Sequence, residues 1–184
     1  MSSDIPLSKK LLVPMTKPQT KPNVEICISI QSHLWDDVNL GIIGDCVEHS
    51  LQTALKEVNK TPESVEEISI VLANDEFIQE LNHTYRGKDA PTNVLSFPQT
   101  EPEEFEYLEF IDSLGDIILS YETIMKESTE QNKTFEKHLK HLLVHGVLHV
   151  LHFDHENEED AQKMESLEIQ ILKQMGIKNP YEII

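Results

Sequence analysis

The sequence predicts a single α/β (α+β) domain of about four strands and five helices. Short segments of alternating or continuous apolar residues, typical of strands, are interleaved with longer segments whose apolar residues recur at helical spacing. Prolines and glycines stand between several of these segments, where turns are expected. The 184 residues suit one domain with a sizeable core, and the sequence shows no internal repeat.

Residues 1–23 differ from the rest of the chain. They contain four prolines and no periodic apolar pattern, which predicts a flexible N-terminal tail ahead of a single domain at residues 24–184. Four lysines against one aspartate give the tail a net charge of +3. The whole chain carries −18, so the predicted domain carries −21.

The predicted strands and helices alternate along this domain. Strands are expected at residues 24–30, 66–73, 94–97 and 114–120. Helices are expected at residues 38–58, about 75–85, 121–131, 134–151 and about 156–175. Asn74 or Asp75 is expected to cap the second helix, and Gly176 to end the last one. The acidic segment 99–113 is expected to be a connection.

Composition excludes several classes of protein. An acidic domain argues against a non-specific nucleic-acid coat protein, because phosphate neutralisation needs lysine and arginine. Cys27 and Cys46 are expected to be small buried thiols, consistent with a reducing compartment. No apolar run approaches the ~20 residues of a membrane span, so we expect a soluble, cytoplasmic protein without a membrane partner.

A histidine-rich segment is the strongest functional signal. Six of the nine histidines lie between residues 138 and 155. His145 and His149 are four residues apart, so on a helix their imidazoles share a face and can hold one metal ion. A turn after Leu151 would bring His155 back as a third ligand. Three nitrogen ligands leave a fourth zinc position open, which is typical of a catalytic site.

Gly146 decides which kind of catalyst this is. The histidine spacing overlays the long zinc-protease signature, in which a glutamate follows the first histidine and acts as the general base. Glycine has no side chain for that role. A metalloprotease of ordinary mechanism is therefore disfavoured, and the sequence does not identify the base.

The segment His145-Gly146-x-Leu148-His149-x-Leu151-x-x-Asp154-His155 resembles the signature of the YbeY-type endoribonucleases, the bacterial rRNA maturation factors. The stretch from Leu81 to Pro98, the segment Leu114-Gly115-Asp116-Ile117 and a later helix with Met164, Glu165 and Glu168 also agree. The resemblance covers residues 24–175 and implies a mixed sheet with helices packed over it, the buried histidine helix being central.

The resemblance also implies the function. One Zn²⁺ per chain would be held by His145, His149 and His155, and Arg86 would face it and assist catalysis. The substrate would be single-stranded RNA, chiefly at the 3′ end of 16S rRNA, with the ribosomal small subunit or its proteins as partners and no DNA. The acidic connection would then lie away from the RNA path or form its rim.

Residues 86–89 also suggest phosphate binding on their own chemistry. Arg86 and Lys88 are two cations around a glycine in an otherwise acidic domain, and the planar arginine fork suits two phosphate oxygens. Lys88 is a candidate substrate contact, whereas Asp89 is expected to be structural. A plain polar loop after a helix is the alternative interpretation.

His152 departs from the family, which has glycine at this place. It can be a turn residue at positive φ, a polar bystander near the site, a partner of a ligand, or a ligand itself. We favour the turn or the bystander, with His155 as the ligand. Among its neighbours, His138 is expected to be exposed and His141 to be buried with a hydrogen bond. Asp154 is expected to cap the last helix or to fix a histidine tautomer.

Two other functions remain open from the sequence. One is a zinc hydrolase of peptides or small molecules, which Gly146 disfavours. The other is a non-catalytic ribosome assembly factor with a structural metal, whose acidic surface would contact a basic ribosomal protein.

Overall fold

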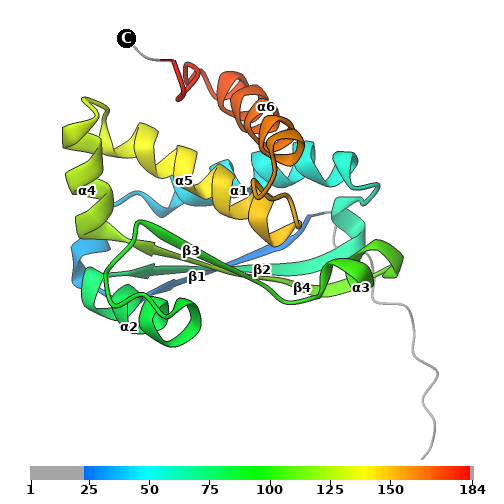
Figure 1. Cartoon of the computed structure of the whole chain (residues 1–184), viewed down its shortest axis with the longest axis horizontal. Helices are drawn as coiled ribbons and strands as arrows, with labels where there is room; N and C mark the ends of the chain where they lie inside the picture. The colour runs from blue at the N-terminus through cyan, green and yellow to red at the C-terminus, as the bar shows by residue number, and fades with distance from the viewer. Residues whose placement is uncertain (1–22, 183–184) are drawn as a thin grey trace, which may run out of the picture.

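The computed structural model describes residues 23–182 and contains one four-stranded mixed sheet (Figure 1). Its strands are β1 (Glu25–Ile30), β2 (Val65–Ala73), β3 (Val94–Pro98) and β4 (Ile111–Ser120). The order across the sheet is β1-β2-β4-β3, with β1, β2 and β4 parallel and β3 antiparallel to β4. The predicted mixed α/β architecture and its four strands are confirmed.

Six helices cover the two faces of this sheet unequally. They are α1 (Leu40–Glu57), α2 (Asp75–Arg86), α3 (Pro102–Tyr107), α4 (Tyr121–Glu130), α5 (Phe135–Val150) and α6 (Glu158–Gln174), with short 3₁₀ turns at His33–Trp35 and Pro62–Ser64. In Figure 1, α1, α4, α5 and α6 lie on one side of the sheet and α2 lies on the other. Helix α5 contacts α1, α4 and α6 as well as β3 and β4, so the histidine helix is central, as predicted.

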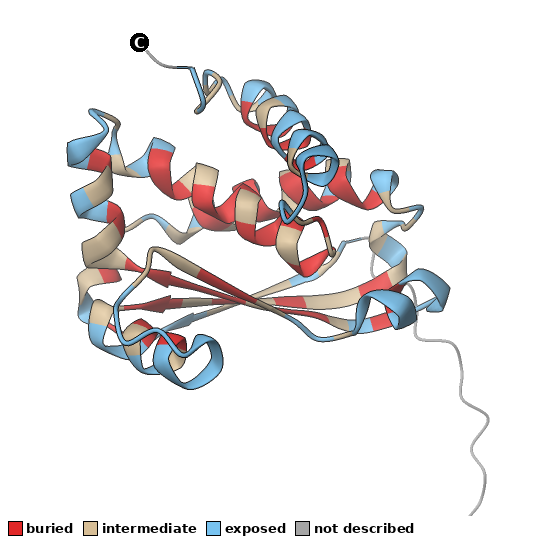
Figure 2. Ribbon diagram, viewed as in Figure 1, coloured by how far each residue is buried: buried red, intermediate tan, exposed pale blue. Residues whose placement is uncertain are grey.

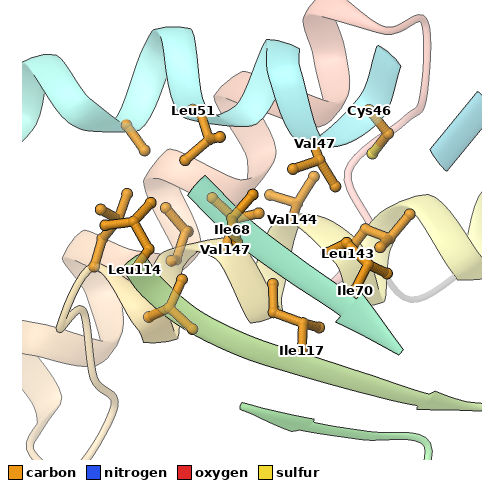
Figure 3. Packing of buried hydrophobic residues seen from close by; sticks show 14 of the residues in the cluster. Cys46, Val47, Leu51, Ile68, Ile70, Leu114, Ile117, Leu143, Val144 and Val147 are labelled. Carbon is orange, nitrogen blue, oxygen red and sulfur yellow. The ribbon is translucent and has the colours of Figure 1, made fainter. Parts of the chain in front are cut away.

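Two hydrophobic clusters correspond to these two faces. The larger one joins α1, α5 and α6 to the sheet, and Figure 3 shows Val144 and Val147 of α5 among Val47 of α1 and Ile117 of β4. The smaller one packs Ile78 of α2 against the other face of the sheet. Figure 2 shows how densely the buried residues follow α5 and the middle of the strands. Burial of this apolar surface on both faces of the sheet is the main force that holds the helices against the sheet.

The prediction for residues 99–113 is wrong. They were expected to be a connection, but they contain α3, and β4 begins at Ile111 rather than Leu114. Pro102 stands in the first turn of α3, where its fixed φ favours a helical conformation. Phe105, in the same helix, is buried. The described residues 23–182 therefore contain six helices rather than the expected five, because Phe105 anchors this segment to the hydrophobic core.

Other local predictions are confirmed, with one exception. Asn74 caps α2 by accepting a hydrogen bond from the backbone N–H of Phe77, and Gly176 follows α6 at a φ of +74°. Cys46 is buried in α1 as predicted, whereas Cys27 was also expected to be buried but is only half-buried in β1. Of the predicted tail at 1–23, residues 1–22 lie outside the described residues. Between residues 23 and 182, none of the helices combines the length and the apolar character needed to span a membrane.

Candidate metal centre

The end of α5 forms the turn that assembles the histidine cluster. Phe153 N–H donates to the carbonyl oxygen of Leu148 at 3.0 Å, and His152 N–H donates to that of His149 at 3.0 Å. This pair of bonds is the Schellman arrangement, in which the residue after the cap adopts left-handed backbone geometry. His152 occupies that position with a φ of +66°. The turn interpretation of His152 is therefore confirmed.

The turn brings His155 back beside His145 and His149. One ring nitrogen of each of these three histidines lies within 4.8 Å of the others, so the group can hold a metal ion. The Nε2 atoms of His145 and His149 are 3.0 Å apart. The ring centroid of His155 lies 5.8 Å from that of His145 and 5.2 Å from that of His149.

His152 lines the same cavity, but its ring contacts other residues than the three clustered histidines. Its Nε2 lies 3.3 Å from the Thr100 hydroxyl, and its ring meets that of Phe105 edge to face with centroids 5.1 Å apart. Burial lowers the pKa of His152, while the charges of Glu101 and Glu103 act in the opposite direction. The acidic connection thus lies beside the turn, at the rim of the histidine cluster.

Gly146 is required by packing. A Cβ atom at this position would lie 2.8 Å from Ile117 Cγ2 and 3.3 Å from the Ser96 hydroxyl. Helix α5 approaches β3 and β4 so closely here that even alanine would collide with a stiff β-branched side chain. A glutamate at 146 has no room, so the structure explains why the protease base is missing.

Glu168 of α6 lies behind the cluster and is completely buried. His145 Nδ1 is 2.6 Å from its Oε1, and the Tyr181 hydroxyl donates to its Oε2. Burial alone would raise the pKa of this carboxyl group, but the nearby His141 imidazole and the hydrogen bonds to His145 and Tyr181 lower the pKa to about 2. Glu168 is therefore an ionised acceptor beside His145.

The imidazole of His149 is held in its neutral form. Burial, reinforced by the neighbouring His145 and His155, lowers its pKa to about 4. A neutral imidazole nitrogen carries the lone pair that a metal ion needs.

Sequence reasoning did not assign a role to Glu168 or to Tyr181. A signal for Glu168 exists, since a single glutamate interrupts the buried stripe of Met164, Leu167 and Ile171 on α6. No pattern in the sequence indicates Tyr181, because its partner is thirteen residues earlier and the chain turns back between them.

The opposite side of the site carries the predicted cations. Arg86 is the last residue of α2, and Gly87 follows with a φ of +66°, which turns the chain toward Lys88. Arg86 Nη2 donates to the Ser96 carbonyl oxygen at 3.3 Å, and its Cζ lies 6.0 Å from the ring centroid of Phe97. Phe97 and Ser96 belong to β3, so the sheet edge supports the guanidinium.

One cavity of about 670 Å³ joins these two sides. It is lined by Arg86, Lys88, His145, His149 and His155, so all five predicted site residues face the same space. Asp89 is outside it and accepts a hydrogen bond from the Gln79 amide at 2.9 Å, in line with its predicted structural role.

Two predictions about neighbouring residues are wrong. His138 was expected to be exposed but is only 3% exposed, because α4 packs over it and brings Glu127 to 2.7 Å from its Nε2. Asp154 was expected to cap α6 or fix a histidine tautomer. Asn157 caps α6 instead, by accepting a bond from the Asp160 N–H.

Asp154 has a different role in the turn. Its Oδ1 accepts a hydrogen bond from the backbone N–H of His155 at 2.7 Å. It therefore fixes the backbone just where the third histidine leaves the turn. His141, expected to be buried, is partly buried, with its Nε2 3.7 Å from Glu168 Oε2.

Comparisons with known proteins show which family the chain resembles. A family model described as "Endoribonuclease YbeY" matches residues 29–176. The chain is 42% identical over 159 residues to the endoribonuclease YbeY of Paramagnetospirillum magneticum, covering 86% of this chain and 96% of that one. It is 43% identical over 150 residues to the protein of the same name from Bradyrhizobium diazoefficiens, covering 76% and 82%.

A solved structure supports the fold. The solution structure of a protein from Thermotoga maritima aligns with a TM-score of 0.52 and 24% identity, covering 86% of this chain and all of that one. At that identity the likeness concerns the architecture alone. The sequence match over most of the chain carries the assignment, and the chain belongs to the YbeY endoribonuclease family.

Proposed function

We propose that this chain is a zinc-dependent endoribonuclease that cleaves single-stranded RNA. Its family is one of RNA-cleaving hydrolases. The observation that carries the proposal is the shared cavity, in which three converging imidazoles face an arginine and a lysine. A metal site alone suits many hydrolases, whereas a metal site opposite two cations suits a substrate that carries phosphate.

The donor set fits one zinc ion held by His145, His149 and His155. A tetrahedral zinc site with Zn–N bonds of about 2.0–2.1 Å places its nitrogens roughly 3.3 Å apart. The Nε2 atoms of His145 and His149 are 3.0 Å apart, close to that value. When bound, zinc would supply Lewis acidity and lower the pKa of a coordinated water to near 7.

Arg86 is proposed to stabilise the charge that develops on the scissile phosphate. Its guanidinium has five N–H donors, of which one on Nη2 is donated to the Ser96 carbonyl oxygen. The remaining planar edge suits two phosphate oxygens in a bidentate grip. Lys88, which is exposed at the cavity rim, is proposed to contact a second phosphate.

The finer parts of the proposal come from the family resemblance. They are the preference for single strands, action at the 3′ end of 16S rRNA, association with the ribosomal small subunit, and a cytoplasmic site of action. DNA is not proposed as a substrate. The acidic charge of −18 favours an added contact with a basic ribosomal protein, which is compatible with catalysis.

The alternative of a peptide hydrolase is weaker. The glutamate that would activate water in such an enzyme is replaced by Gly146, and the packing of α5 against Ile117 leaves no room for it. No other observation at the cavity favours a peptide over a phosphate ester.

The test combines metal analysis with cleavage of a fluorescent single-stranded RNA. Wild type should contain about one zinc per chain and should lose cleavage with a chelator. Arg86→Ala should keep zinc and lose cleavage. Lys126→Ala is the matched control, since this exposed lysine of α4 is absent from the cavity lining and its variant should behave as wild type. RNA cleavage indifferent to both chelator and Arg86 would contradict the proposal.

A further inference from the structure

The buried carboxylate of Glu168 is engaged on both of its oxygens. Oε1 lies 2.6 Å from His145 Nδ1, and Oε2 accepts the hydrogen bond of the Tyr181 hydroxyl. A buried carboxylate needs such partners, because an unsatisfied charge in the interior is costly. His141 Nε2, at 3.7 Å from Oε2, is too distant for a good hydrogen bond.

This arrangement determines the tautomer of His145. An ionised carboxylate only accepts hydrogen bonds, so Nδ1 of His145 must carry the proton. The other ring nitrogen, Nε2, is then left with its lone pair. That atom is the one that lies 3.0 Å from His149 Nε2, inside the histidine cluster. Glu168 thus directs the lone pair of His145 into the metal position.

Tyr181 reaches Glu168 because the chain reverses after α6. Gly176 adopts a φ of +74°, and Ile177 N–H donates to the Leu172 carbonyl oxygen at 2.9 Å, which closes the end of the helix. The following segment returns along α6, and Tyr181 is held by an N–H bond to the Asn179 side chain at 2.9 Å.

The tyrosine ring also packs against helix α5. Tyr181 meets His141 edge to face, with ring centroids 5.7 Å apart and an interplanar angle of 88°. Tyr181 is nevertheless 42% exposed and lies outside the hydrophobic core. Loss of its hydroxyl should therefore leave the fold intact while it releases Glu168 Oε2.

We propose that Glu168 is the positioning residue of His145 and that Tyr181 positions Glu168, so that the C-terminal segment 176–182 completes the metal site. The inference rests on the proposed function, since it assumes that the histidine cluster binds zinc. Groups that orient a metal ligand from behind typically contribute about 10–100-fold in metal affinity. Without the tyrosine, the carboxylate can rotate about its own axis toward His141, and the bond to His145 lengthens.

Metal affinity of the full-length protein tests this directly. Zinc is removed, and rebinding of zinc is measured by competition with a chromophoric chelator. Glu168→Gln should weaken zinc binding by about 10–100-fold and Tyr181→Phe by about 10-fold. Tyr107→Phe is the matched control, because Tyr107 is 81% exposed and does not contact the cluster, and it should bind zinc as wild type does.

A second measurement separates positioning from mere folding. Nitrogen-15 NMR of the imidazoles in the metal-free protein should show His145 as the Nδ1–H tautomer in wild type and as a mixture in Tyr181→Phe. Thermal unfolding of the metal-free variant should stay near that of wild type. Wild-type zinc affinity together with an unchanged tautomer in Tyr181→Phe would overturn the role of Tyr181.

The two failures are distinguishable. If wild type binds neither zinc nor cobalt at the cluster, the proposed function fails, and the metal-affinity test no longer applies. The NMR measurement of the His145 tautomer then decides by itself whether Glu168 and Tyr181 position His145. If wild type binds one zinc and the variants match it, only the positioning inference fails.

Discussion

The two sides of the cavity are built differently. One side, which we call the metal wall, consists of His145, His149 and His155 with Glu168 behind them. The other, which we call the basic wall, consists of Arg86 and Lys88 beside the edge strand β3. In the metal wall a helix, a hydrogen-bonded turn and a buried carboxylate fix the side chains. In the basic wall Arg86 has a 3.3 Å bond to one backbone oxygen, and Lys88 is exposed.

This difference matches the demands of the two ligands. A metal ion requires its donor nitrogens within tenths of an ångström, so their orientation must exist before binding. A phosphodiester backbone varies in path, and long cationic side chains can follow it. The walls should therefore fail separately. Damage to the metal wall should remove the metal, whereas damage to the basic wall should remove catalysis and leave the metal in place.

The largest effect is expected from the ligands of the metal wall. His145→Ala, His149→Ala and His155→Ala should each remove most of the bound zinc and reduce RNA cleavage to background, because two remaining nitrogens hold zinc poorly. Inductively coupled plasma mass spectrometry and RNA cleavage on one preparation provide the measurement. His152→Ala is the control, since its ring is directed to Thr100. An emptied site in His152→Ala beside full occupancy in His155→Ala would refute the ligand assignment.

A smaller effect is expected where α5 touches the sheet. Gly146→Ala should destabilise the protein, because the added methyl group collides with Ile117 and overpacking costs about 1–3 kcal/mol. The gain of helix propensity, about 1 kcal/mol, offsets only part of this cost. Gly44→Ala in α1 is the matched control, since a Cβ there meets nothing within 4 Å.

Urea unfolding of both glycine variants gives the comparison. Gly44→Ala should raise the free energy of unfolding by about 0.5–1 kcal/mol, and Gly146→Ala should lower it. Equal stabilisation by both substitutions would show that α5 does not approach the sheet as closely as the structure indicates.

A still smaller effect is expected at the turn. His152→Gly restores the residue that suits a φ of +66°, which is worth up to about 1 kcal/mol, but it loses the contact with Phe105. The net change in unfolding free energy should stay within about 1 kcal/mol, with zinc fully retained. Loss of zinc from this variant would mean that His152 supports the metal wall after all.

No effect on either wall is expected from residues 1–23. Their four prolines and lack of apolar periodicity predict that a deletion keeps fold and metal content. Circular dichroism and zinc analysis of the protein lacking residues 1–23 provide the measurement. An unfolded or zinc-free product would contradict the predicted domain boundary.

The sequence allowed prediction of features that depend on local spacing. The four strands, the central α5 and the convergence of His145, His149 and His155 follow from periodicity, a four-residue interval and a turn. Features that depend on distant packing were not predictable in the same way. The burial of His138 depends on α4, and α3 depends on Phe105 reaching the core.

The support behind the metal wall is the clearest example. Glu168 is 23 residues from His145 in the chain, and Tyr181 reaches it only after the reversal at Gly176. No local rule connects these three residues. The spacing of the histidines therefore predicted the candidate metal ligands, whereas Glu168 and Tyr181, which orient His145, are identified only from the three-dimensional structure.

The separation of the two walls is tested most directly by Arg86→Lys. Lysine keeps the positive charge but lacks the two parallel N–H groups that grip two phosphate oxygens. The measurement is single-turnover cleavage of a single-stranded RNA, with zinc content and thermal unfolding determined on the same preparation. We predict one zinc per chain, an unchanged unfolding temperature, and cleavage slower by ~10²-fold or more, the scale of losing one preorganised donor. Wild-type cleavage by Arg86→Lys, or loss of its zinc, would contradict the account.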